Sequence, residues 1–187
     1  MRWLGTALVL GTAWLALAAG PAAPSSSPPA QNRAASWLAL RPVTVRCLTE
    51  REAARDEVIT DENALAYVEG RWDGKRFWPG DVATFAPRMC APLVALVRGY
   101  PHSYPLEELA LALLVLTLEA GHLRGHAWAG HEGRVQCWAL RHVGYAARRL
   151  GVAAQTVPHV VALALEWDAR LPENYRWPDC RRPKPSR

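Results

Sequence analysis

The chain has 187 residues and a formal net charge of +5, enough for one domain and a tail. The excess charge lies at the ends: Arg2 contributes one positive charge and segment 181–187 contributes four. The remaining basic and acidic residues cancel. A domain without net charge argues against a basic nucleic-acid-binding face, so we expect no nucleic-acid partner.

The N-terminal segment has the pattern of an export signal. Arg2 precedes an apolar run over residues 3–19 that is broken only by Gly and Thr. Within that run, Ala16 and Ala18, on either side of Leu17, supply the small residues that a signal peptidase accepts. We therefore predict a signal peptide over residues 1–18 and a secreted or extracytoplasmic location. An uncleaved membrane tether through residues 3–19 is the alternative, because the run approaches the length that spans a bilayer.

Three further segments follow the leader. Residues 19–36 are rich in Pro, Ala and Ser and bury too little apolar surface to offset their ordering entropy, so we predict a disordered linker. The folded domain is expected over residues 37–180, a typical domain length. Residues 181–187 form a basic tail, which we interpret as a solvated end.

The start of the domain carries short local signals. Residues 43–47 alternate and contain β-branched side chains, which is typical of a strand. Thr49 and Glu52 have the spacing of a capping box, and this predicts a short helix over residues 50–58.

An aromatic-rich segment, residues 67–85, contains two turn signals, Asp73-Gly74 and Pro79-Gly80. This pattern indicates a β-hairpin or a meander.

The rest of the domain is predicted to be helical. Apolar periodicity, Pro near helix starts and Gly at helix ends set the expected boundaries. The helices are expected over residues 88–98 (ending at Gly99), 105–125, 131–150 (ending at Gly151) and 156–170. Residues 109–118 are apolar nearly all round, which favours a buried central helix. The predicted fold class is mainly α with a small N-terminal β element (α+β), in a disulfide-stapled helical domain.

Four cysteines follow the leader: Cys47, Cys90, Cys137 and Cys180. An even number in an exported chain points to two disulfides. Four cysteines allow three pairings, and the sequence does not select among them. Sequential pairing is the one we favour, because it staples each half of the domain separately. No two of the four have the close spacing of a four-cysteine zinc site.

The most informative pattern lies in residues 114–125, at the end of the predicted central helix. Glu119, His122 and Gly125 match the later part of H-E-x-x-H-x-x-G, but Leu118 stands at the first His. In H-E-x-x-H, two His on one helical face hold zinc and the Glu takes a proton from the metal-bound water.

Other residues extend this pattern in chain order. They are Val45-Arg46-Cys47, Ala86-Pro87-Arg88-Met89-Cys90, Glu119, His122, Gly125, Glu132 and Cys137. The ordered set spans most of the predicted domain. It resembles small secreted bacterial zincin-like proteins of the H-E-x-x-H type, a metallopeptidase-like family.

The resemblance implies a zincin-like fold, a zinc cofactor and roles for three residues. Glu119 corresponds to the general base, His122 to the second metal ligand and Glu132 to the third. The chain departs from the family at Leu118, which has no donor atom. It also departs in the connection from Gly125 to Glu132, which is longer than the family pattern.

Two interpretations of this site stay open. In the first, His126 and His131 join His122 and Glu132 in a rearranged tetrahedral zinc site. In the second, no metal is bound, and Glu119 pairs with Arg124, Arg134 or His122 in a structural cluster, since an unpaired buried acid is costly.

Three functional hypotheses follow. The one we favour is an exported, degenerate metallopeptidase-like protein that is catalytically inactive, carries no cofactor, and binds an unidentified protein or envelope component. The first alternative is an active exported zinc peptidase or hydrolase using His122, His126, His131 and Glu132, with Glu119 as general base. The second is a structural, disulfide-stapled envelope module.

Overall fold

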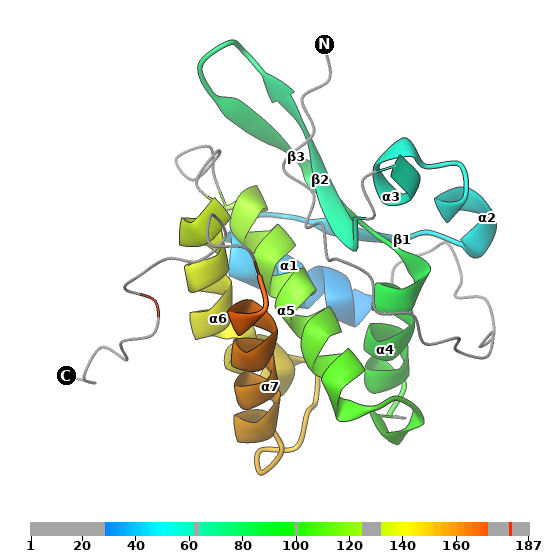
Figure 1. Cartoon of the computed structure of the whole chain (residues 1–187), viewed down its shortest axis with the longest axis vertical. Coiled ribbons are helices and arrows are strands. Elements are labelled where there is room, and N and C mark those ends of the chain that lie inside the picture. Colours follow the sequence, from blue (N-terminus) through cyan, green and yellow to red (C-terminus); the bar gives the residue numbers. More distant parts are fainter. Residues whose placement is uncertain (1–28, 62–63, 100, 125–131, 172–179, 181–187) are drawn as a thin grey trace.

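The computed structural model describes residues 29–61, 64–99, 101–124, 132–171 and 180 (Figure 1). The predicted signal peptide, the basic tail and the segment with His126 and His131 lie outside these residues. In chain order the elements are α1 (Pro29–Ala39), β1 (Thr44–Cys47), α2 (Glu50–Ala53), α3 (Glu57–Asp61), β2 (Ala66–Trp72), β3 (Phe77–Phe85), α4 (Pro87–Val97), a 3₁₀ turn (Pro101–Ser103), α5 (Leu106–Leu123), α6 (Glu132–Arg149) and α7 (Val157–Ala169). The predicted class, mainly α with a small β element, is confirmed.

The strands form one small mixed sheet with the order β1-β3-β2. β1 runs parallel to β3, and β2 runs antiparallel to it. The predicted hairpin is thus confirmed, and its outer part extends beyond the helices in Figure 1. Its turn is built by Asp73, whose carboxylate accepts the backbone N–H groups of Lys75 and Arg76, and by Gly74 at φ +92°.

The prediction of a second turn at Pro79-Gly80 is wrong. Both residues lie inside β3, where Pro79 pairs with Gly70 across a register shift that follows Val68. The bulge explains how a proline, which lacks a ladder donor, is accommodated in the strand. At Gly80, a Cβ would lie 2.9 Å from the carbonyl oxygen of Glu69, so glycine permits the close approach of the two strands.

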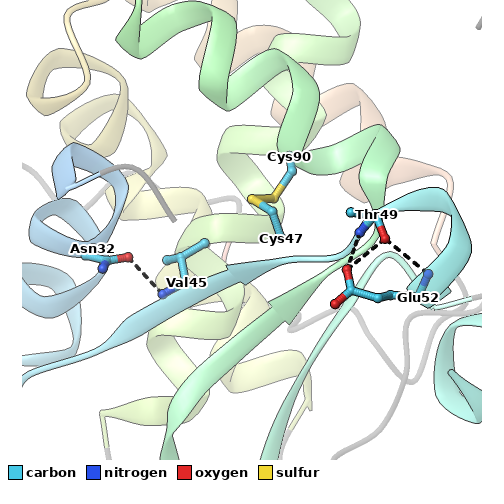
Figure 2. Close-up of a disulfide and its surroundings, with 6 residues drawn as sticks. All are labelled: Asn32, Val45, Cys47, Thr49, Glu52 and Cys90. Carbon is cyan, nitrogen blue, oxygen red and sulfur yellow. Dashed lines mark hydrogen bonds between the residues drawn. A yellow bond between two sulfur atoms is a disulfide. The ribbon is translucent and has the colours of Figure 1, made fainter. Parts of the chain in front are cut away.

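The capping box is confirmed, but the helix that it starts is short. The Thr49 hydroxyl accepts the N–H of Glu52, and the Glu52 carboxylate accepts the N–H of Thr49 at 2.8 Å (Figure 2). The predicted single helix over residues 50–58 is two helices, α2 and α3. The break follows from a second local cap, in which the Asp56 carboxylate accepts the N–H of Ile59.

The predicted disorder of residues 29–36 is wrong, because α1 begins at Pro29. Gln31, Ala34, Ala35 and Leu38 are buried at helical spacing on one side of α1. The Asn32 amide oxygen accepts the N–H of Val45 at 3.0 Å and so ties α1 to β1 (Figure 2). The Pro, Ala and Ser content hides this short amphipathic pattern, and the folded domain starts earlier than the predicted residue 37.

The remaining helices agree with their predicted ranges to within about two residues. Pro105 occupies the N-cap position of α5, and Leu106 is the first helical residue. Gly99 and Gly151 have φ +82° and +92°, the left-handed conformation expected where α4 and α6 end. α5 contacts α1, α4, α6, α7 and strands β2 and β3, so it is the buried central helix that we expected.

Both disulfides follow the favoured sequential pairing. Cys47 at the end of β1 is bonded to Cys90 of α4, with Cα atoms 5.7 Å apart (Figure 2). Cys137 of α6 is bonded to Cys180, with Cα atoms 5.1 Å apart. Each bond therefore staples one half of the domain, and such bonds indicate an oxidising compartment outside the cytoplasm. Within the described ranges, no helix is long and apolar enough to cross a membrane.

The corrected start of the domain can be tested in α1. Ala35 is 1% exposed, so Ala35→Asp should lower the free energy of unfolding by about 3 kcal/mol, because it buries a charged group. The exposed neighbour Arg33 provides the matched control, since Arg33→Asp introduces the same side chain into solvent. Urea unfolding of the two variants measures the difference, and an equal, small effect would mean that α1 does not pack on the domain.

Candidate functional site

Three of the predicted site residues lie together where α5 ends and α6 begins. Glu119 and His122 stand three residues apart on α5, and Glu132 is the first residue of α6. The His122 Nε2 atom lies 3.3 Å from the Glu132 Oε2 atom, and the two side chains are 11% and 13% exposed. We call Glu119, His122 and Glu132 the carboxylate–histidine cluster.

The close approach of α5 and α6 depends on Gly121. A Cβ at this position would lie 2.8 Å from Val135 and 3.0 Å from Trp138, both on α6. A larger residue would therefore push α6 away from α5 beside the cluster. The glycine lets the first turn of α6 bring Glu132 within reach of His122.

Leu118 is part of the apolar core. It is 4% exposed and lies one helical turn before His122, on the same side of α5. With Gln136 of α6 and with Trp167 and Leu171 it lines a cavity of about 10 Å³. That space is at the lower limit for one water molecule. The position of the missing first ligand is thus filled by hydrocarbon.

Burial changes the proton affinities of the cluster. Glu119 is 6% exposed, and this burial raises the pKa of its carboxyl to about 7, with His122 opposing the shift and Glu132 adding to it. Burial alone would lower the pKa of His122. The contact with Glu132 and the charges of Glu132 and Glu119 outweigh this effect and raise the pKa of His122 above its usual value.

The described residues include two of the predicted zinc ligands, His122 and Glu132. In this part of the chain, no group of three His, Cys, Asp or Glu side chains is arranged to hold a metal ion. Glu119, His122 and Glu132 are close, but Leu118 offers no donor atom. The two proposed substitute ligands, His126 and His131, lie outside the described residues. Of the predicted site residues, the structure therefore brings three together and does not describe the other two.

Sequence reasoning missed Gln136. It is 2% exposed, and within the described part of the chain neither its amide oxygen nor its amide nitrogen has a hydrogen-bond partner. It lies one turn after Glu132 on α6 and lines the same cavity as Leu118. A helical spacing of four from Glu132 was the available signal, since residues so spaced share one face.

The fold and the cluster define a class: a disulfide-stapled, mainly helical α+β domain with a buried carboxylate–histidine cluster at a helix junction. Comparison with protein-family models, with curated proteins and with solved structures returns no match to this chain. The likeness to zincin-like proteins therefore depends on the motif residues alone.

The raised pKa of Glu119 gives a prediction about stability and pH. Its folded-state pKa of about 7 exceeds the ordinary value of 4.5, so the folded state holds this proton more tightly. That stabilisation is present below pH 4.5 and is lost as the pH rises through 7. The free energy of unfolding should fall from pH 5 to pH 8, and Glu119→Gln should reduce this fall by roughly 2 kcal/mol.

Urea unfolding of the parent and of Glu119→Gln at the two pH values measures the effect. Glu107→Gln is the matched control, because Glu107 is exposed on the first turn of the same helix. His122, whose pKa is also raised, loses stabilisation in the same direction, and Glu119→Gln also reduces this contribution because the charge of Glu119 is one cause of the shift. The same fall in the parent and in Glu119→Gln would contradict the assignment.

Proposed function

We propose that this chain is an exported, degenerate metallopeptidase-like protein that is catalytically inactive and acts by binding in the cell envelope. In this proposal the carboxylate–histidine cluster is a structural remnant and not a zinc site. The observation that carries the proposal is the pairing of His122 with Glu132 while Leu118 packs in the core one turn away.

Two features support loss of catalysis. A general base has to reach a substrate or a water molecule, and Glu119 is only 6% exposed near the end of the buried helix α5. Leu118, by contrast, adds apolar packing against Trp167 and Leu171, which is the gain expected when a ligand position is converted to core.

Export is supported by the two disulfides together with the apolar leader of residues 3–19. A disulfide-stapled domain without a catalytic site is still folded and can bind a partner through its surface, so we propose binding as its activity. An active zinc hydrolase that recruits His126 and His131 is the competing function, and metal content separates the two.

The first test is the zinc content of the pure mature chain, residues 19–187, after growth in rich medium. We expect less than about 0.1 zinc per chain, because Leu118 leaves the motif one ligand short. His122→Ala serves as the control for ligand-dependent metal. One zinc per parent chain that is absent from His122→Ala would overturn the proposal in favour of the rearranged active site.

The second test addresses ancestry through Leu118→His. If the scaffold derives from a zincin-like enzyme, the new imidazole lies one turn before His122 and the variant should bind zinc at least about tenfold more tightly than the parent. The matched control is Leu114→His, because Leu114 lines the same cavity but stands two turns from His122. Zinc titration by calorimetry measures the affinities, and equal binding by both variants would count against the ancestry.

A further inference from the structure

A run of aromatic and arginine side chains lies along one face of α6. Trp138, His142, Tyr145 and Arg149 follow one another at helical spacing. The Trp138 and His142 rings stack with centroids 4.2 Å apart. The run spans about 16 Å of helix, so it presents a surface and not a single contact point.

Helix α1 adds the Trp37 ring to this face, and the exposed Leu40 follows directly after the end of α1. The Trp37 ring stacks on Tyr145 with centroids 3.8 Å apart and an interplanar angle of 18°. The Arg149 guanidinium lies 5.5 Å from the Trp37 centroid and 5.1 Å from the Tyr145 centroid. Trp37 nevertheless stays 44% exposed, and Leu40, one turn further on, is 68% exposed. We call Trp37, Leu40, Tyr145, Arg148 and Arg149 the α1–α6 patch.

Leu40 is unusual for two independent reasons. It is the only non-glycine residue among those described that has a positive φ, +57°, a conformation that strains a leucine. It is also the most exposed of the large apolar side chains in the described ranges. The backbone conformation is that of a helix end, because the N–H of Arg41 bonds to the carbonyl of Ser36 and the N–H of Leu40 bonds to the carbonyl of Trp37. Glycine is the usual residue at such a position, and core packing does not explain an exposed leucine there.

The charge of the patch identifies the chemistry of its partner. Every charged residue of α6 after Glu132 is an arginine: Arg134, Arg141, Arg148 and Arg149. All four are exposed, and Arg134 already has an interaction within the protein, which leaves Arg141, Arg148 and Arg149 to carry the argument. A surface with charges of one sign repels a second copy of itself, which argues against a homodimer through this face. Complementarity instead requires an anionic partner.

The mixture of side chains favours a lipid surface as that partner. Exposed Trp and Leu enter the boundary between headgroups and acyl chains, and Tyr and Arg suit the headgroup level because each has an apolar body and a polar end. Arginines meet anionic headgroups.

We infer that the α1–α6 patch docks the protein onto an anionic lipid bilayer, with Trp37 and Leu40 entering the headgroup region and Arg148 and Arg149 meeting lipid phosphates. The inference depends on export, as proposed above, but not on the state of the carboxylate–histidine cluster. Zinc measurements therefore leave it untouched, and its failure does not affect the proposed loss of catalysis.

Vesicle flotation with the mature chain, residues 19–187, tests this docking. The parent should bind vesicles containing roughly one-third phosphatidylglycerol in phosphatidylcholine, bind phosphatidylcholine vesicles at least about tenfold more weakly, and lose affinity as salt is raised. Arg148→Gln with Arg149→Gln should weaken binding by roughly tenfold. The matched control pair is Arg51→Gln with Arg55→Gln, two exposed arginines near α2.

Leu40→Asn is the decisive variant, because asparagine tolerates the left-handed backbone and should keep the fold at least as stable as the parent. It should weaken binding by roughly fivefold to tenfold, since the apolar side chain no longer enters the lipid. Leu165→Asn on α7 is the control, because Leu165 is 44% exposed. Urea unfolding checks that each variant is folded.

Three outcomes would overturn the inference. The parent fails to bind the anionic vesicles, Leu40→Asn binds them as the parent does, or both control variants weaken binding as much as the patch variants. In the second outcome, a soluble polyanion can also displace the protein from the vesicles. The arginines would then bind an acidic polymer and not lipid. Loss of binding confined to the patch variants supports the inference.

Discussion

Helix α5 is apolar around nearly its whole circumference, and every residue from Leu109 to Gly121 is buried. Such a helix has to be covered on all sides, which requires α1, α4, α6, α7 and the sheet to pack around it. The same packing encloses the polar groups that α5 carries. Thr117 resolves this locally by donating to the carbonyl of Leu113 at 2.7 Å. His122 needs a partner from another element, so Glu132 of α6 follows from burying α5.

Elements with strong local chemistry were predictable from the sequence. The Thr49–Glu52 capping box and the glycines at 99 and 151 act within a few residues of the chain, and the structure has them where expected. Elements that depend on distant contacts were not. α1 is rich in Ala, Ser, Gln and Asn, and its helical state is favoured by packing on α5 and by the bond from Val45 to Asn32. Pro79-Gly80 has turn propensity, but pairing with β2 overrides it.

The candidate site shows the same division. The motif residues Glu119 and His122 were identified from spacing within one helix, and a resemblance supplied Glu132. The surroundings of Leu118 were not predictable, because Gln136, Trp167 and Leu171 come from α6, from α7 and from the residues just after it. The angle at which these helices cross depends on side-chain volumes at their contact, for example on the absence of a Cβ at Gly121. A pattern within one segment of the sequence does not predict this angle.

The protonation state that the fold favours opposes the state that zinc needs. Burial favours a neutral Glu119, while Glu132 favours a protonated His122, so the cluster can reach zero net charge without any cation. Zinc requires the reverse arrangement, with a neutral histidine offering a lone pair and an ionised Glu119 ready to act as base. The Nε2 atom of His122 already contacts Glu132. A metal at this site would have to displace that proton and share the Nε2 atom of His122 with Glu132.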